Sequence, residues 1–189
     1  MAKKPNSVNV TAAKPKLAGA VFVAPLGTEL PTDAVADLNA AFMSLGYVSK
    51  DGVTNVNTAS SESTSAWGGD VVLDGQTEKP DTFKFTLLEA LNPDVLKFVY
   101  GDKNVTGTLE EGIKVTANRE EALDRAMVID MIMRNNAVKR IVIPRAKVSK
   151  VDEIAYRQGA PVGYGTEITA TPDENGATHY EYIKAAADT

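Results

Sequence analysis

Few residues of this chain could carry out catalysis, because its 189 residues include one histidine and no cysteine. The absence of cysteine excludes disulfide bonds, thiol catalysis and cysteine zinc sites. The histidine, His179, stands in the stretch THYEYIK beside Tyr180 and Tyr182. A catalytic base needs a nucleophile and an orienting acid, and no spacing in the sequence supplies either. We therefore expect a structural histidine on a strand, no cofactor and no enzymatic activity.

The acidic stretch from Asp70 to Asp81 is the nearest match to a metal site. It places acids at positions one and five of a calcium-binding loop, and a glycine at position six. Val72 occupies position three, where an oxygen ligand is needed, and Asp81 stands at position twelve, where a bidentate glutamate is expected. The stretch therefore favours a strand end and a turn over a calcium site.

A basic cluster in the C-terminal half raises the question of nucleic-acid binding. Arg140, Arg145, Lys147 and Lys150 follow one another closely, but no aromatic residues stand between them to stack on bases. The whole chain has 25 acidic and 20 basic residues, a net charge of −5, which argues against general binding to phosphate backbones. Charge also comes in blocks, with four lysines and no acid in residues 1–28 but fifteen acids and eight bases in residues 50–133. Such blocks suit surfaces that meet complementary surfaces.

Composition and length indicate one globular domain with an arm. Hydrophobic residues make up 43% and charged residues 24%, which is ordinary for a folded domain. No apolar run reaches the roughly 20 residues of a membrane helix, and no apolar segment follows the N-terminal lysines, so we expect a soluble cytoplasmic chain without a membrane span. Residues 1–16 are polar and basic with two prolines, and we expect an N-terminal arm there, followed by a single domain over residues 17–189.

A Ser/Thr-rich segment interrupts the domain. Between residues 54 and 66, nine of thirteen residues are Ser, Thr or Asn, and Glu62 is the only charged one. Unstructured loops of this length are uncommon inside compact domains, so such a segment needs a partner to order it. We expect an extended loop at about residues 50–66, mobile in the free subunit, then a strand that begins at Trp67. Deleting residues 54–65 is expected to spare the fold.

Two helices are expected from local signals. Thr32 and Asp33 are a helix start signal. The apolar residues of the segment after them recur at helical spacing: Val35, Leu38, Phe42 and Leu45. In LNPDVLKFVYG, Asn92 suits the N-cap, Pro93 the first helical position and Gly101 the C-terminal stop. The sequence thus predicts short helices over residues 33–45 and 93–100.

The other segments predict antiparallel strands. DTFKFTL alternates apolar and polar residues, as a half-buried strand does. Residues 123–134 and 138–148 are expected to pair through a turn at Asn135-Asn136, with Pro144 demoting the second strand to an edge or a bulge. On the first strand, the face with Met127 and Met131 should pack inward. Asp130 should face the other way, so that Asp130→Lys leaves the subunit folded.

Together these elements predict a mainly β fold: an antiparallel β-sandwich with one or two short flanking α-helices, a long loop and an extended terminal arm. Several segments, in the right order over nearly the whole chain, resemble the major tail tube protein of long-tailed, non-contractile bacteriophages. They are TAAKPKLAGAVFVAPLGTELPTDA, LGYVSKDGVT, AWGGDVV, FKFTLLEALNPDVLKFVYG and VIPRAKVSKVDEIAYRQGAPVGYGTEITATPDENGATHYEYIK.

The resemblance implies a structural virion protein of the tail-tube fold. Its partners would be further copies of itself, in six-fold rings stacked into a hollow tube, and the tape measure, tail terminator and tail-tip proteins. Double-stranded DNA would pass through the tube without specific binding, and an acidic protein would repel it. The protein would be assembled in the host cytoplasm and reside in the virion tail.

Two sets of residues are candidates for the assembly contacts. The paired strands offer candidate tube-wall residues: Met127, Ile129, Asp130, Met131, Met133, Arg134, Arg140 and Arg145. The long loop offers candidate inter-ring residues: Asp51, Asn55, Ser61, Glu62 and Trp67. The alternative reading is a β-sandwich binding or adhesin module on a larger particle, which would display clustered exposed aromatic residues.

Overall fold

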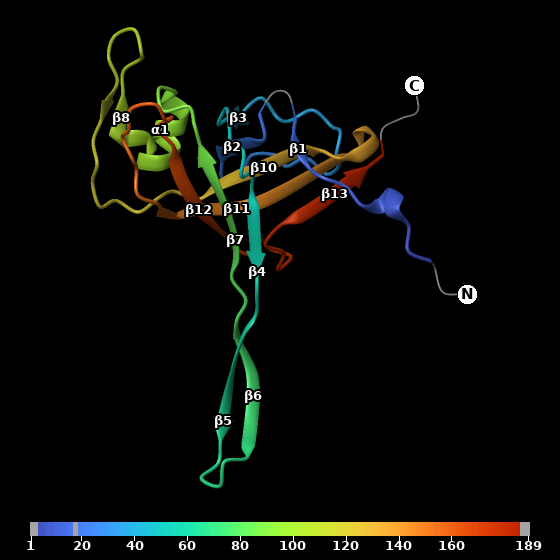
Figure 1. Cartoon of the computed structure of the whole chain (residues 1–189). Coiled ribbons are helices and arrows are strands. Elements are labelled where there is room, and N and C mark those ends of the chain that lie inside the picture. Colours follow the sequence, from blue (N-terminus) through green and yellow to red (C-terminus); the bar gives the residue numbers. More distant parts are fainter. Residues whose placement is uncertain (1–3, 17–18, 186–189) are drawn as a thin grey trace.

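Antiparallel strands dominate the computed structural model, which describes residues 4–16 and 19–185 (Figure 1). The large sheet contains β1 (Lys14–Pro15), β2 (Val21–Pro25), β3 (Met43–Ser44), β4 (Thr54–Asn57), β7 (Asp81–Leu87), β10 (Arg125–Ile132), β11 (Val138–Val151), β12 (Tyr164–Ala170) and β13 (Tyr180–Lys184). Two small sheets pair β5 (Ser60–Ser65) with β6 (Val71–Glu78), and β8 (Val105–Thr106) with β9 (Lys114–Val115). The helical elements are α1 (Pro93–Tyr100) and the 3-10 turns η1 (Ser7–Asn9), η2 (Asp102–Asn104) and η3 (Arg134–Asn136).

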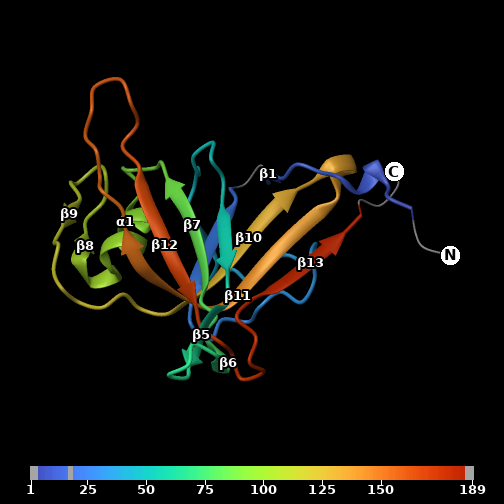
Figure 2. The ribbon, with the colours of Figure 1, turned by 60° about the horizontal axis from the view of Figure 1, so that its bottom comes forward.

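Strand β11 joins the two halves of the sandwich. Its first half pairs with β13 and its second half with β12, while β10 runs along its other edge. The strand order β3-β2-β10-β11-β12-β7-β4 therefore folds over at β11, and Figure 2 shows β12, β7 and β4 running at an angle to β10 and β11. Pro144 lies where the register against β10 shifts, between the pairs Met127↔Ile143 and Arg125↔Ala146. The expected bulge is confirmed, and it occurs where a residue without an N–H is tolerated.

The core lies between the two halves. Phe83, Phe85 and Leu87 alternate with more exposed residues along β7, as the sequence pattern predicts. They pack in one cluster with apolar residues of β2, β10, β11 and β12. Helix α1 covers one end of this cluster with its buried side chains, and Phe98 stacks on Phe85 with ring centroids 6.3 Å apart. The predicted mainly β, antiparallel sandwich is confirmed.

Helix α1 begins and ends where its sequence signals place it. The Asn92 side chain accepts a hydrogen bond from the Asp94 N–H, and Pro93 follows as the first helical residue. Gly101 closes the helix with φ +95°, a conformation that glycine adopts without strain, and its N–H donates to the Lys97 carbonyl. Among the described residues no helix combines the length and apolar character that crossing a lipid bilayer requires.

The helix predicted over residues 33–45 is wrong. This segment is an irregular loop that ends in the two residues of β3. The Asp33 carboxylate accepts hydrogen bonds from the N–H groups of Val35 and Ala36, which fixes a local turn. Val35 points to solvent, so the apolar spacing does not correspond to one buried face. One flanking α-helix, not two, is present in the part of the chain that the structure describes.

The long loop is also different from the prediction. Residues 54–57 are β4, which pairs with β7 inside the large sheet, and residues 60–65 are β5, half of a hairpin with β6. The strand expected to begin at Trp67 begins at Val71, because residues 66–70 form the turn of that hairpin. Deleting residues 54–65 would remove a sheet strand, so the expectation that this deletion spares the fold is withdrawn.

Packing of α1 on the sheet leads to a stability prediction. Phe98→Ala should lower the free energy of unfolding by about 3–5 kcal/mol, because it leaves a cavity beside Phe85. Leu91→Ala is the control, because Leu91 lies two residues before the helix and its side chain is two-thirds exposed; it should cost less than about 1 kcal/mol. Urea unfolding followed by circular dichroism measures both, and equal costs would contradict the packing assignment.

Candidate assembly surface

A hairpin without any buried residue projects from the sandwich. Strands β5 and β6 continue the β4·β7 ladder outward, from the pair Asn57↔Asp81 to Ser60↔Glu78 and on to Ser65↔Val71. In Figure 1 this arm extends well beyond the large sheet, and every residue from 54 to 80 is exposed. Two isolated strands are marginally stable in water, and this arm has no apolar burial of its own to stabilise it.

Apolar side chains gather at the end of this arm. Trp67 stands in the terminal turn at 106% of the reference exposure for tryptophan, and Val71, Val72 and Leu73 follow it, each more than 60% exposed. Large exposed apolar groups placed together mark contact surfaces. Of the candidate inter-ring residues, Ser61 and Glu62 lie on β5 and Trp67 at the tip, whereas Asp51 lies before β4, outside the arm.

A buried carboxylate, Asp81, anchors the root of the hairpin. It is 1% exposed and accepts hydrogen bonds from Asn55 Nδ2 (2.7 Å) and Thr178 Oγ1 (2.6 Å). His179 Nδ1 lies 2.5 Å from its Oδ2, and the ring packs edge-on against Phe83. Asn55, a candidate for an inter-ring contact, thus bonds within its own subunit, and His179 has the structural role that we expected, although it lies just before β13.

The surroundings of Asp81 determine its protonation. Burial works to raise the pKa of its carboxyl, whereas the three hydrogen-bonding side chains stabilise the carboxylate. The hydrogen bonds prevail, and the pKa of Asp81 lies below the ordinary aspartate value. No local pattern in the sequence predicts this role of Asp81, because its partners Thr178 and His179 lie almost a hundred residues away.

The stretch from Asp70 to Asp81 does not close into a metal loop. Its central part is the extended strand β6, so its carboxylates are spread along the hairpin. Among the described residues there is no group of three or more acidic or histidine side chains placed to hold a metal ion.

The tube-wall candidates divide between buried and exposed positions. Met127 and Ile129 are fully buried in the sandwich core, and Met131 packs partly against it. Met133 and Arg134 lie at the η3 turn, where both Asn135 and Asn136 have φ +56°, which confirms the predicted turn. Arg145 is half-exposed and donates from Nε to Asp124 Oδ2 at 2.6 Å.

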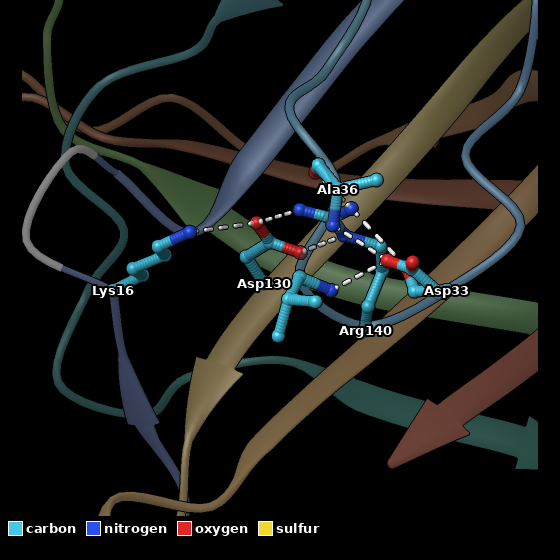
Figure 3. Close-up of polar contacts among 6 residues, drawn as sticks. Lys16, Asp33, Ala36, Asp130 and Arg140 are labelled. Carbon is cyan, nitrogen blue, oxygen red and sulfur yellow. Dashed lines mark hydrogen bonds and ion pairs between the residues drawn. The ribbon is translucent and has the colours of Figure 1, made fainter. Parts of the chain in front are cut away.

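Asp130 and Arg140, the remaining two candidates, form a buried ion pair across β10 and β11 (Figure 3). Each is 1% exposed, and the contact is bidentate, with Nε–Oδ1 at 2.7 Å and Nη2–Oδ2 at 2.8 Å. Arg140 Nη1 also donates to the carbonyls of Asp33 (3.2 Å) and Ala36 (2.7 Å). Lys16 Nζ lies 3.8 Å from Asp130 Oδ2 and adds a second cation.

This pair corrects the expectation for the outer face of β10. Asp130 does point away from Met127 and Ile129, but the loop around residues 33–36 covers it. Val128 on the same face is also fully buried. A lysine at position 130 would bring two cations together in a buried site, so the structure now predicts that Asp130→Lys destabilises the subunit, contrary to the expectation from the sequence.

The edges of the large sheet are open for further pairing. In the described part of the chain, β4 pairs only with β7, and β13 pairs only with β11. Each therefore presents one row of backbone N–H and C=O groups to its surroundings. Open edges invite pairing with another chain, and a monomer normally protects them.

Comparison with known proteins adds one finding. The family model described as "Phage tail tube protein" matches residues 1–189. The match thus includes the N-terminal segment, the β5–β6 hairpin and both halves of the sandwich. A search of the curated proteins finds no match.

The buried ion pair predicts that Asp130→Lys unfolds the subunit or lowers the free energy of unfolding by at least about 3–5 kcal/mol. Glu181→Lys is the matched control, because it makes the same charge change in the more exposed Lys139–Glu181 pair on β11 and β13. The control should cost no more than about 1 kcal/mol. Thermal and urea unfolding compare the two, and similar losses would show that Asp130 is not held by a buried pair.

The lowered pKa of Asp81 predicts a pH dependence. Its stabilising effect is present above the ordinary aspartate pKa of about 4 and is lost as pH falls through the lower native pKa. Asp81→Asn should therefore cost about 1–3 kcal/mol at pH 7, and the difference from the unsubstituted chain should shrink below about pH 4. Urea unfolding between pH 3 and 7 measures this, with Asp70→Asn at the exposed hairpin tip as the control. A difference that does not change with pH would contradict the assignment.

Proposed function

The chain belongs to the phage tail tube protein family, and on this basis we propose that it polymerises as stacked hexameric rings that form the tube of a long, non-contractile phage tail. The resemblance found in the sequence is confirmed at the level of the family. The protein is a structural component of the virion tail. Beyond the family, we propose six subunits in each ring, stacking of the rings and passage of DNA through the tube.

The observation that carries the proposal is the projecting hairpin β5–β6. It is exposed over its whole length and carries tryptophan, valine and leucine side chains at its far end. An arm of this kind gains nothing for the subunit alone, because it buries no apolar surface. Contact with a neighbouring ring would bury these side chains and stabilise the arm.

Ring closure would use the open edges of the large sheet. Strands β4 and β13 each have one unpaired side, and neighbouring subunits could continue the sheet from there. Strands β10 and β11 would form the frame of the tube wall, held together by the Asp130–Arg140 pair and the buried Met127 and Ile129. Among the wall candidates, Arg134 and the half-exposed Arg145 reach the surface where a neighbour or the lumen could contact them.

The acidic balance of the chain agrees with a conduit for DNA. A net charge of −5 per subunit adds over a ring and repels phosphates, so that DNA slides instead of binding. We further infer tape measure, tail terminator and tail-tip proteins as partners, assembly in the host cytoplasm, and a role that involves no cofactor and no catalysis.

Removing the hairpin without damaging the sheet tests the proposal. Replacing residues 58–80 by an Asn-Gly turn retains β4, β7 and Asp81, since two-residue turns of this type join antiparallel strands. The variant should have the circular dichroism and unfolding midpoint of a folded subunit but form no tubes by electron microscopy, whereas the full chain forms them at high concentration or with a tail initiator. Normal tubes from the variant would refute the role of the hairpin. A full chain that stays monomeric even with the initiator would refute the proposed function.

A further inference from the structure

The tip of the hairpin combines one aromatic side chain with negative charge. Ala66 and Asp70 close the turn through a 2.8 Å hydrogen bond from the Ala66 N–H to the Asp70 carbonyl, which leaves Trp67 outside the turn. Asp70 is the carboxylate of this turn, Asp74 and Glu62 lie farther along the strands, and Glu78 lies at the root, where it pairs with Ser60. A receptor for this tip needs an apolar pocket and an excess of cations.

A groove of about 350 Å³ at the other end of the subunit has these properties. It lies between the N-terminal arm, the segment 48–53 and β10. Its apolar lining consists of Ala13, Pro15, Ala20, Val48, Val53 and Met131. Lys14 and Lys50 border it together with one acid, Asp51, and neither lysine forms an ion pair with a described residue of its own subunit.

Other grooves suit an acidic tip less well. The groove between residues 26–30 and 172–175 has one arginine and two carboxylates, and so does the groove beside Leu123. The groove at α1 has three basic and three acidic residues. Among these grooves of the described chain, the one at Lys14 and Lys50 has the excess of positive charge.

The hairpin tip and this groove lie at opposite ends of the same ladder. Val48 forms a bridge to Leu87, the last residue of β7, whereas the hairpin leaves the sheet at Asp81, the first. Figure 1 likewise shows β1 at the end of the sheet away from the β5–β6 turn. From Asn57 to Trp67 the arm spans roughly 33 Å at the usual strand rise, so its tip points away from the groove of its own subunit.

We propose that Trp67 of one copy inserts into the groove formed by residues 13–15, 48–53 and Met131 of the next copy along the tube, with Asp70 beside Lys50. The inference rests on the proposed function, and it names the receptor of the hairpin. Such a contact joins two different surfaces, and repetition of a head-to-tail contact that does not close on itself produces an open filament. The occupant is a second copy of this chain.

Trp67 is the only tryptophan, so its fluorescence reports its own surroundings. The emission maximum of the free subunit should be that of a water-exposed indole. In tubes it should shift to shorter wavelength, and acrylamide quenching should fall several-fold. Tubes in which Trp67 keeps the emission and quenching of the free subunit would overturn the inference and leave the proposed function intact.

A charge exchange tests the pairing of tip and groove. Asp70→Lys and Lys50→Glu should each raise the concentration needed for tube formation about tenfold, and the double variant should restore it. Lys103→Glu, on the 3-10 turn after α1, is the matched control, and combining it with Asp70→Lys should not restore tube formation.

Trp67→Ala tests the aromatic anchor. It should raise the concentration needed for tube formation by about tenfold or more, as loss of a central aromatic anchor does. Full assembly by Trp67→Ala, or equal restoration by both double variants, would overturn the proposed receptor. It would also be overturned if the Trp67 emission shifted to shorter wavelength only when a different tail protein was added, because that protein would then be the receptor.

Discussion

The ion pair of Asp130 and Arg140 is the interaction on which the arrangement of the sandwich depends. Each of these two buried ions loses its hydration on folding, so the loss must be offset by hydrogen bonds and by the opposite charge. The pair meets this need with a bidentate contact, two backbone carbonyls and a nearby lysine. Those carbonyls belong to residues 33 and 36, so satisfying Arg140 also holds the covering loop in place. The loop thus lies against the buried pair, and Val128 on the same face of β10 is fully buried as well.

The hairpin follows the opposite rule. Its root is fixed by Asp81, a carboxylate that joins β4, β7 and the segment before β13, while every residue of β5 and β6 is exposed. The subunit is thus stabilised on both faces of β10 and left without apolar burial along β5 and β6. The sandwich therefore supplies the stability of the subunit, whereas the β5–β6 hairpin stays exposed.

The elements that the sequence predicts correctly are those with local signals. Asn92, Pro93 and Gly101 stand within one short segment, and they suffice to begin and end α1. The alternation along β7 and the asparagines of the β10–β11 turn are local in the same way. The segment 33–45 is not helical: the Asp33 carboxylate fixes a local turn, and the carbonyls of Asp33 and Ala36 accept from Arg140, more than a hundred residues away. The partners of Asp81 were equally remote, and no spacing rule connects them. The Ser/Thr-rich composition of β5 predicts a loop, but an exposed strand pair needs no apolar alternation.

The anchoring of the hairpin root matters for assembly because a repeated contact multiplies its own error. If each copy joined the next through a freely swinging arm, the angle between successive copies would vary, and a straight tube would not result. Asp81 restrains the arm at the point where it leaves the sheet, through donors from β4 and from the segment before β13. These donors are short side chains with few rotamers, in contrast to the long lysines of the groove, whose flexible ends tolerate small misfits. With the proposed receptor, a restrained root would give every copy of the arm the same direction, and flexible lysine ends would tolerate small misfits, as a structure built from many identical subunits requires.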